Sequence, residues 1–392
     1  MRNLKLTLCL SIALSTAAAY AQVLSSDVNG NAQAATSNSP VAYIYVSSTN
    51  NSTNEIVAYA AAANGRLSAV SGSPFPDNVS VMAVNGKYLM AATNSNPPDI
   101  DTLRIGSNGA LTYVTSTPCV QKDNQCVYAF NLFFDHTGSD LYVMDSDGSN
   151  DNTASFAVDE SSGALNYLGD TISGAFPGDA TGTFFIGDNI YAYSADQEAC
   201  LYPGLYGYQR ESSGLLNFIN NFKSNNPTPP PGVSTYYPDL AVADATNHLA
   251  IIEQPANPPG CANGPLQLAT YTVKSNGNIH TNSTYKDMPA TLIKSPYDMK
   301  MSPSGKLLAV AGQEGLQVFH FNGANPVTHY TGLLTKEPIS QMFWDNNDHL
   351  YAISQSSGKL FVYTITPTGH QMAPGSPYTI SSPDDIIVQP LK

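Results

Sequence analysis

Acidic side chains that could hold a metal ion gather in the segment DSDGSNDN, residues 145–152. Asp145, Asp147 and Asp151 alternate there with other oxygen-bearing side chains, a pattern typical of loops that bind Ca2+. The segment lacks the spaced terminal glutamate of an EF-hand, so a solvated polar loop is the alternative interpretation. These three aspartates are the candidate ligands of a calcium ion, and no zinc pattern or phosphate-binding loop indicates another cofactor.

Further carboxylates and tyrosines stand at the ends of short apolar stretches. Glu253 ends the stretch LAIIEQ, and Asp239 and Asp298 stand near the starts of two others. Tyr237 and Tyr297 lie beside those aspartates, and aromatic rings next to polar groups suit a neutral sugar or a peptide segment. These five residues are the candidate ligand-binding set, with Glu253 as the candidate catalytic residue. Packing in the core is the alternative for the tyrosines, because the chain contains 23 of them.

The elements that must position these residues are announced by a phrase that recurs seven times. SSGALNYL at 161–168 returns in altered form as ANGRLSAV, SNGALTYV, SSGLLNFI, SNGNIHTN, NGANPVTHY and PTGHQMAPG. Their glycines are Gly65, Gly109, Gly163, Gly214, Gly277, Gly323 and Gly369, spaced 44 to 63 residues apart. That spacing is typical of propeller blades with loop insertions, and each phrase has the chemistry of a β-hairpin turn.

Apolar, β-branched and aromatic stretches before each turn predict four strands per repeat. The first repeat lacks the first of its four strands, and DDIIVQPL at 384–391 has the same character. We therefore predict an all-β, seven-bladed β-propeller of four-stranded antiparallel blades over residues 41–392, closed by the C-terminal strand joining the N-terminal blade. The alternatives are an open β-solenoid, or six or eight blades if the degenerate region 220–238 is misread.

The long insertions fall on one face of this predicted ring. Turns between first and second strands and between third and fourth strands are short, whereas the connections on the other face include DSDGSNDN, SADQEACLYPG, EQPANPPGCANGP and SNNPTPPPGVSTYYPD. Long loops on a rigid scaffold commonly carry binding sites. We predict that this long-loop face binds the ligand, although insertions can also accumulate wherever they are tolerated.

The first 21 residues have the features of a secretory signal peptide. Two basic residues precede an apolar run over 6–14, and AYA at 19–21 provides small residues at the cleavage positions. The run is shorter than the roughly 20 residues that span a bilayer. We predict cleavage after Ala21, a secreted or periplasmic location, no membrane insertion, and a polar, flexible leader over 22–40.

Four cysteines follow the predicted cleavage site, and an even number in an exported chain indicates disulfides. Cys119 and Cys126 flank one blade-to-blade connection, and Cys200 and Cys261 lie in equivalent loops of adjacent blades. Of the three possible pairings, the repeat selects Cys119–Cys126 and Cys200–Cys261. Both disulfides would fix loops rather than perform redox chemistry.

The charge of the chain excludes some partners. The formal net charge is −14, and only 12% of residues are charged, against roughly 25% in ordinary soluble domains. An acidic surface repels nucleic acid and anionic membranes. We predict no nucleic-acid partner and a monomer that meets a small molecule, a neutral glycan or another protein.

The strand and turn pattern resembles that of a known family. YIYVSS, IVAYAA and NGRLSAVSGSPF in the first repeat, and PYDMKMSPSGKLLAVAG in a later one, resemble the bacterial seven-bladed lactonase-like propellers over residues 41–392. That family includes 6-phosphogluconolactonase of the propeller type and the carboxymuconate cyclase fold. The resemblance implies His, Arg and Glu around one mouth of the channel, where cations would neutralise an anionic substrate.

This chain departs from that expectation. Its arginines after the predicted signal peptide, Arg66, Arg104 and Arg210, fall in third strands or beside a third-to-fourth turn. Three histidines (His136, His248 and His349) fall in first-to-second turns, and the other four (His280, His320, His329 and His370) fall in outer strands. Only Glu253 stands where the resemblance places an acid.

Three functions follow from the sequence. The first is an exported binding protein that takes a neutral or cationic ligand on the long-loop face. The second is a lactone hydrolase of the 6-phosphogluconolactonase type acting at the channel mouth, which the missing mouth cations disfavour because an anionic substrate lacks a donor. The third is a scaffold within a cell-surface assembly.

Overall fold

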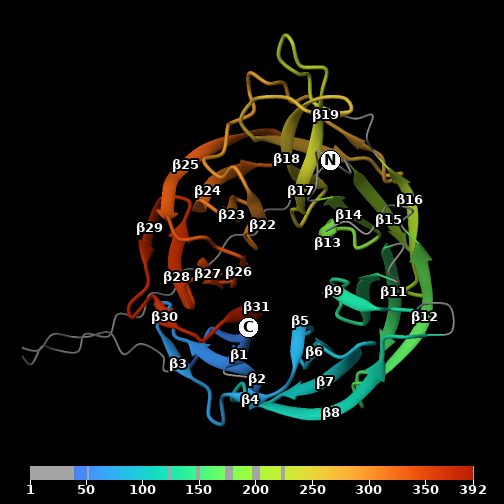
Figure 1. The fold of residues 1–392 in the computed structure, drawn as a ribbon, viewed down its shortest axis with the longest axis vertical. Helices are drawn as coiled ribbons and strands as arrows, with labels where there is room; N and C mark the ends of the chain where they lie inside the picture. Colours follow the sequence, from blue (N-terminus) through green and yellow to red (C-terminus); the bar gives the residue numbers. More distant parts are fainter. Residues whose placement is uncertain are drawn as a thin grey trace, which may run out of the picture. The chain divides into compact units, whose positions relative to one another are not determined.

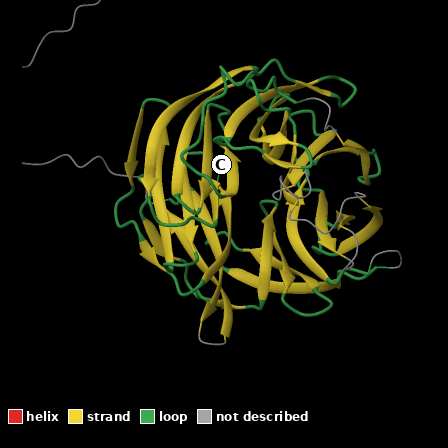
Figure 2. Cartoon of the chain, turned by 45° about the horizontal axis from the view of Figure 1, so that its top comes forward, coloured by secondary structure: helices red, strands yellow, loops and turns green. Residues whose placement is uncertain are grey.

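Seven antiparallel β-sheets form the folded part of the chain. The computed structural model describes residues 39–50, 53–121, 125–146, 151–172, 180–196, 204–221 and 226–391. These residues contain strands, turns and loops but no helix (Figure 2); none of them therefore forms a helix able to span a membrane. The predicted signal peptide, 1–21, and nearly all of the predicted leader, 22–40, lie outside the described residues.

The sheets are the blades of a propeller, arranged in a ring with their first strands around a central channel (Figure 1). Blade 1 contains, from the channel outward, β31 (Pro383–Pro390), β1 (Ala42–Asn50), β2 (Thr53–Ala61) and β3 (Leu67–Ala69), with β4 (Phe75–Pro76) also paired to β2. Blade 2 contains β5 (Val79–Val84), β6 (Tyr88–Thr93), β7 (Asp99–Ile105) and β8 (Leu111–Pro118). Blade 3 contains β9 (Tyr128–Phe134), β10 (Asp140–Ser146), β11 (Asp151–Val158) and β12 (Leu165–Ile172).

The remaining four blades repeat this order. Blade 4 contains β13 (Ala180–Phe185), β14 (Tyr191–Asp196), β15 (Leu205–Arg210) and β16 (Leu216–Asn221). Blade 5 contains β17 (Thr235–Ala243), β18 (His248–Asn257), β20 (Gln267–Val273) and β21 (Ile279–His280), with β19 (Gly260–Cys261) paired to β18. Blade 6 contains β22 (Pro296–Met301), β23 (Leu307–Gly312), β24 (Gly315–Asn322) and β25 (Asn325–Thr335). Blade 7 contains β26 (Gln341–Trp344), β27 (His349–Ser354), β28 (Lys359–Thr366) and β29 (Gly369–Met372), with β30 (Tyr378–Thr379) paired to β28.

The predicted fold and ring closure are confirmed. The C-terminal strand β31 pairs antiparallel with β1, with Tyr45 opposite Ile387. Next to this pair, the Leu391 amide donates to the Val41 carbonyl at 2.8 Å. The N-terminal blade therefore obtains its innermost strand from the other end of the chain, and no β-strand edge is left open in the ring.

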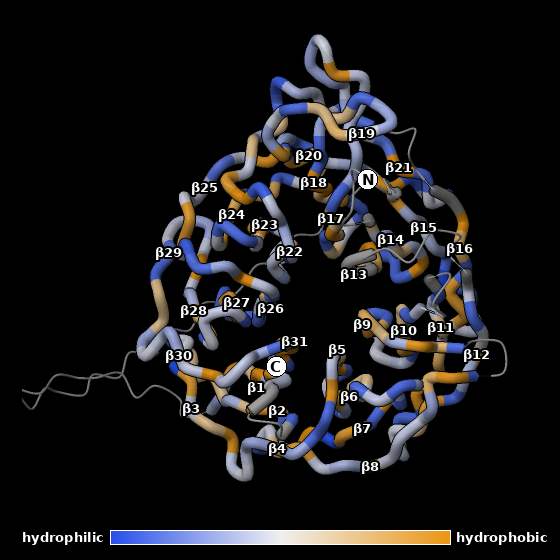
Figure 3. Tube along the Cα trace, viewed as in Figure 1, coloured by the Kyte–Doolittle hydropathy of each residue, from blue (hydrophilic) through white to orange (hydrophobic). Residues whose placement is uncertain are grey.

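The hydrophobic core lies between the blades rather than inside any one of them. Each of seven hydrophobic clusters joins residues of two neighbouring blades, and Figure 3 shows hydrophobic stretches recurring in the strands around the ring. Strands packed on both faces need apolar residues at consecutive positions, and β23 and β27 are buried throughout. This explains why the second strands read as continuous apolar runs.

The recurring glycine turns dock each blade onto the one before it. Gly277 has a φ of +78 to +80° in common with Gly65 and Gly109, and a Cβ at position 277 would lie 2.6 Å from the Tyr191 ring. The Tyr193 hydroxyl donates to the Gly277 carbonyl at 2.6 Å, as the Tyr45 hydroxyl does to Gly109 at 3.0 Å. Glycine is required because the turn combines a left-handed backbone with close approach to a neighbouring blade.

The inner edges of three blades are closed by side chains instead of strands. Asp298 on β22 accepts a hydrogen bond from the Met342 amide of blade 7 at 2.9 Å. Asp385 on β31 accepts from the Met82 amide of blade 2 at 2.7 Å. An innermost strand has no further strand to satisfy these N–H groups. The two carboxylates therefore connect neighbouring blades around the channel.

One predicted disulfide is present in the described part of the structure. Cys119 and Cys126 are joined, and both are fully buried. Cys261 lies in β19, but Cys200 lies outside the described residues. The Cys200–Cys261 pairing therefore stays a prediction.

Candidate functional site

A cavity of about 1080 Å³ occupies the channel at the centre of the ring. Its walls come from all seven blades, through the innermost strands β5, β9, β13, β17, β22, β26 and β31 and the residues that follow them. Asn85, His136, Asp244 and Ser302, which belong to turns between first and second strands, line it too. The cavity thus extends toward the short-turn face rather than lying only at the long-loop face.

Aromatic side chains dominate the wall. Eight line the cavity, and they are Phe130, Phe133, Phe134, Phe184, Phe185, Tyr297, Phe343 and Trp344. Phe133 stacks on Tyr142 of the same blade, with ring centroids 5.1 Å apart, and contacts Phe185 of blade 4 at 6.2 Å. An apolar wall with a few polar groups is the usual construction of a site for a small organic ligand.

Lys300 supplies the cavity with an ammonium group. Its Nζ lies 2.8 Å from Asp298 Oδ1, and the Lys300 side chain retains 17% of its exposure. The same nitrogen lies 5.3 Å from the centroid of Phe184 and 5.2 Å from that of Phe343. Both distances are within the range of a cation–π contact, so the charge is held between two aromatic rings and one carboxylate.

Asp385 supplies a second carboxyl on the wall, beside Gln341. Burial raises its pKa from 3.8 to about 7, with a contribution from neighbouring Asp384, although hydrogen bonds from the Met82 amide and Gln341 oppose the rise. Gln341 Oε1 in turn accepts from the Ile386 amide at 3.0 Å. The Asp385 carboxyl therefore changes protonation near neutral pH, as a general base must.

The predicted ligand-binding residues divide into two groups. Asp298 and Tyr297 line the cavity, and the Tyr297 hydroxyl donates to Gln313 Oε1 at 2.7 Å. Asp239, Tyr237 and Glu253 do not belong to the cavity wall as far as the described residues define it. Blade 5 therefore holds the second group away from the cavity that blade 6 helps to form.

Glu253, the candidate catalytic residue, is fully buried. The Tyr271 hydroxyl donates to its Oε1 at 2.6 Å, and its Oε2 has no hydrogen-bond partner among the described residues. Burial raises its pKa from 4.5 to about 8, and the charge of Asp239 adds to the rise while the Tyr271 bond opposes it. The carboxyl is thus neutral at neutral pH and enclosed within blade 5.

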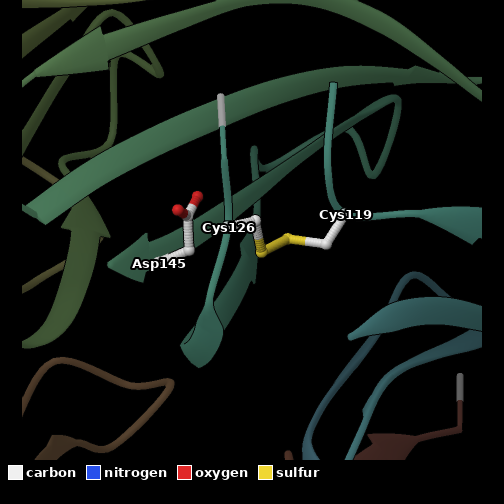
Figure 4. A group of neighbouring side chains, drawn as sticks. All are labelled: Cys119, Cys126 and Asp145. Atoms are coloured by element: carbon white, nitrogen blue, oxygen red, sulfur yellow. A yellow bond between two sulfur atoms is a disulfide. The ribbon is translucent and has the colours of Figure 1, made fainter. Parts of the chain in front are cut away.

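The predicted calcium ligands are only partly described. Asp145 ends β10 as a fully buried residue; Asp147 lies outside the described residues, and Asp151 is described only as the first residue of β11. In the described ranges, one group of potential metal ligands lies within 4.8 Å, namely Asp145 with Cys119 and Cys126 (Figure 4). Sulfurs joined in a disulfide offer no thiolate, and Ca2+ takes oxygen ligands. The calcium site stays a prediction.

The cations of the chain are placed partly as predicted. Arg210 pairs with Asp140 of blade 3, and His349 Nδ1 lies 2.7 Å from Asp345 Oδ2 in a buried turn. His136, expected away from the site on the short-turn face, lines the cavity. Reasoning that considered only histidine and arginine missed Lys300. The pattern Asp-x-Lys over 298–300 was available as a signal, because residues two apart on a strand share a face.

Comparison with known proteins shows what the fold is similar to. No protein-family model matches the chain, and no curated protein matches its sequence. A solved Lactobacillus plantarum protein aligns over 90% of this chain and 100% of its own, with a TM-score of 0.66 and 11% identity. A putative 6-phosphogluconolactonase from Bacteroides fragilis aligns over 90% and 99%, with a TM-score of 0.63 and 11% identity.

A third solved structure is a periplasmic gluconolactonase from Pseudomonas aeruginosa. It aligns over 90% of this chain and 99% of its own, with a TM-score of 0.62 and 15% identity. The fold of this chain is therefore that of the seven-bladed lactonase-like propellers, as the sequence resemblance predicted. At such identities the similarity establishes the fold, and the activity has to be argued from the cavity.

Proposed function

We propose that this protein is an exported monomer that binds a small organic molecule with an apolar body inside its central channel. The observation that supports this proposal is the cavity of about 1080 Å³ with eight aromatic side chains in its wall. Ligand pockets usually occupy roughly 300–1,000 Å³. Burying about 200 Å² of apolar ligand surface would provide on the order of 5 kcal/mol.

The chain carries its own reporter for this binding. Trp344 is the single tryptophan, and it lines the cavity. N-phenyl-1-naphthylamine, a neutral apolar fluorophore, should quench Trp344 emission by energy transfer with a stoichiometry of one per chain. Ala243→Phe, which adds a ring to the wall at the end of β17, should weaken this binding at least tenfold. Ala63→Phe in an exposed turn is the matched control and should leave it unchanged. Absence of saturable binding would refute the proposal.

Export is supported by two observations beyond the N-terminal sequence pattern. The buried Cys119–Cys126 disulfide is of a kind that persists in oxidising compartments, and one solved protein of this fold is named as periplasmic. Expression of the full chain in a bacterium, followed by mass determination of the periplasmic product, should give a protein that begins at Gln22. A product that retains its first 21 residues in the cytoplasm would contradict export.

Lactone hydrolysis is the second candidate function. Two of the similar structures are named as lactonases, and Asp385, with its pKa raised to about 7, lines the cavity. Its carboxylate would take a proton from water as the water oxygen bonds to the lactone carbonyl carbon. The ring C–O bond then breaks, and the ring oxygen takes the proton back to give a hydroxy acid.

The two carboxyls of raised pKa separate the versions of this second function. If the channel is the catalytic site, Asp385→Asn should lower kcat for lactone opening by about 10² to 10⁴, with Glu253→Gln as the control that leaves it unchanged. If activity is instead lost in Glu253→Gln and retained in Asp385→Asn, the reaction belongs to the blade 5 site. Release of acid from a panel of sugar and alkyl lactones, followed at constant pH, measures both.

A further inference from the structure

We infer that Lys300 selects the molecule that the channel binds, and that this molecule is neutral and carries a carbonyl-type hydrogen-bond acceptor on an apolar body. The inference rests on the proposed function, because it assumes that the cavity takes a ligand. It goes beyond that proposal by naming the chemical class and the residue that recognises it.

The hydrogen bonds of Lys300 leave donors for such an acceptor. An ammonium group has three N–H donors, and the described residues accept one of them, through Asp298 Oδ1 at 2.8 Å. Phe184 and Phe343 lie on the ammonium at 5.3 and 5.2 Å, where their faces attract the charge without accepting a conventional hydrogen bond. Two donors on a side chain that is mostly buried thus remain for a partner within the cavity that Lys300 lines.

Asp298 holds the ammonium in place and does not have to move when a ligand arrives. Its Oδ1 also accepts from the Met299 amide at 2.9 Å, and its Oδ2 accepts from the Met342 amide at 2.9 Å. Backbone donors therefore stabilise the carboxylate from two strands. The indole of Trp344 adds a bond from Nε1 to the Lys300 carbonyl at 3.3 Å, which connects β26 to β22 behind the ammonium.

The charge around Lys300 favours a neutral ligand. An anion placed on the ammonium would lie close to Asp298 as well, and Asp244 and Asp385 also line the cavity, whereas no other lysine or arginine belongs to its described wall. The net charge of −14 opposes anions at longer range. A cation would meet Lys300 itself and an Asp298 whose two oxygens already accept three hydrogen bonds. A carbonyl oxygen avoids both penalties.

Three fluorinated probes of equal size test this inference by 19F NMR titration of the full chain after export. They are 4-fluoroacetophenone, which has a neutral acceptor, 4-fluoroethylbenzene, which has none, and 4-fluorobenzoate, which is an anion. A hydrogen bond to a charged donor predicts that native protein binds the ketone about tenfold more tightly than the hydrocarbon. The benzoate should bind more weakly than the ketone.

Variants at position 300 assign the preference to the ammonium. Lys300→Met keeps an apolar stem and should bind the ketone and the hydrocarbon equally, whereas Lys300→Arg, which keeps the donors, should restore most of the difference. Lys300→Met/Asp298→Asn removes the charge pair together, which covers the case in which Lys300→Met alone fails to fold. Thermal melting verifies that each variant is folded.

The outcomes separate this inference from the function on which it rests. If no probe binds native protein, the proposed binding function fails. If the hydrocarbon binds native protein but the ketone has no advantage, or keeps its advantage in Lys300→Met, the role of Lys300 is refuted while channel binding stands. If the benzoate binds about tenfold more tightly than the ketone, the neutral class is wrong.

Discussion

Replacing Glu253 with glutamine tests whether this buried carboxyl is a neutral structural group. Burial raises its pKa from 4.5 to about 8, so at pH values between these the folded protein binds a proton that the unfolded chain has released. The free energy of unfolding therefore contains the full contribution of this proton below pH 4.5 and loses it progressively as the pH rises to about 8. The loss across that range is on the order of 4 kcal/mol, and about 3 kcal/mol of it falls between pH 5.5 and 8.5.

Glutamine is neutral at every pH, and its carbonyl can accept the Tyr271 hydroxyl as Glu253 Oε1 does. At pH 5.5 the variant should unfold within about 1 kcal/mol of native protein. At pH 8.5 its free energy of unfolding should have gained roughly 3 kcal/mol relative to native protein, because only native protein loses the bound proton.

Urea unfolding at both pH values, followed through the single tryptophan, measures these differences. Glu160→Gln, at an exposed glutamate of a turn, is the control, and its effect should stay within about 0.5 kcal/mol at either pH. If Glu253→Gln and native protein differ by the same amount at pH 5.5 and 8.5, the carboxyl is not held neutral, and the reasoning about blade 5 is refuted.

The remaining predictions concern backbone and covalent constraints. Gly277→Ala should lower the free energy of unfolding more than Gly86→Ala; both glycines have positive φ, but a Cβ at 277 would lie 2.6 Å from Tyr191 whereas nothing lies within 4 Å at 86. The left-handed backbone alone costs about 1–2 kcal/mol, so equal losses in urea unfolding would disprove the clash. Reducing the Cys119–Cys126 disulfide, whose cysteines are 7 residues apart, should cost roughly 2–3 kcal/mol by loop entropy. Thermal melting with and without a dithiol measures it, and an unchanged melting temperature would show that packing alone fixes this loop.

The fold was predictable because one structural unit is repeated with its turn chemistry intact. Each glycine turn announces an outer hairpin, and the turn glycines must be glycine for reasons that include contact with a neighbouring blade, as Gly109 and Tyr43 show. The absence of a first strand in the first repeat, together with the character of 384–391, was enough to predict the pairing of β31 with β1. Local chemistry and global closure thus supported the same answer.

The site was less predictable, because a propeller brings together residues that are separated by most of the chain. Phe184, Lys300 and Phe343 meet only when blades 4, 6 and 7 close around the channel. The aromatic pairs in NLFF, TFFI and QMFW had the spacing of ordinary core residues, and nothing in the sequence told which blade interfaces would leave space. Loop length drew attention to the long-loop face, whereas the cavity follows the inner strands toward the short turns.

Ring closure by the last strand also determines when the protein can finish folding. Strand β1 pairs with β31, so blade 1 cannot be completed until the final residues have been synthesised, although its other strands are among the first made. Chains emerge at about 5–20 residues per second and fold from the N-terminus, so β1 waits for tens of seconds with an open edge. A precursor that is still being translated is therefore the form with an exposed strand edge, and it is the form that a chaperone would have to protect.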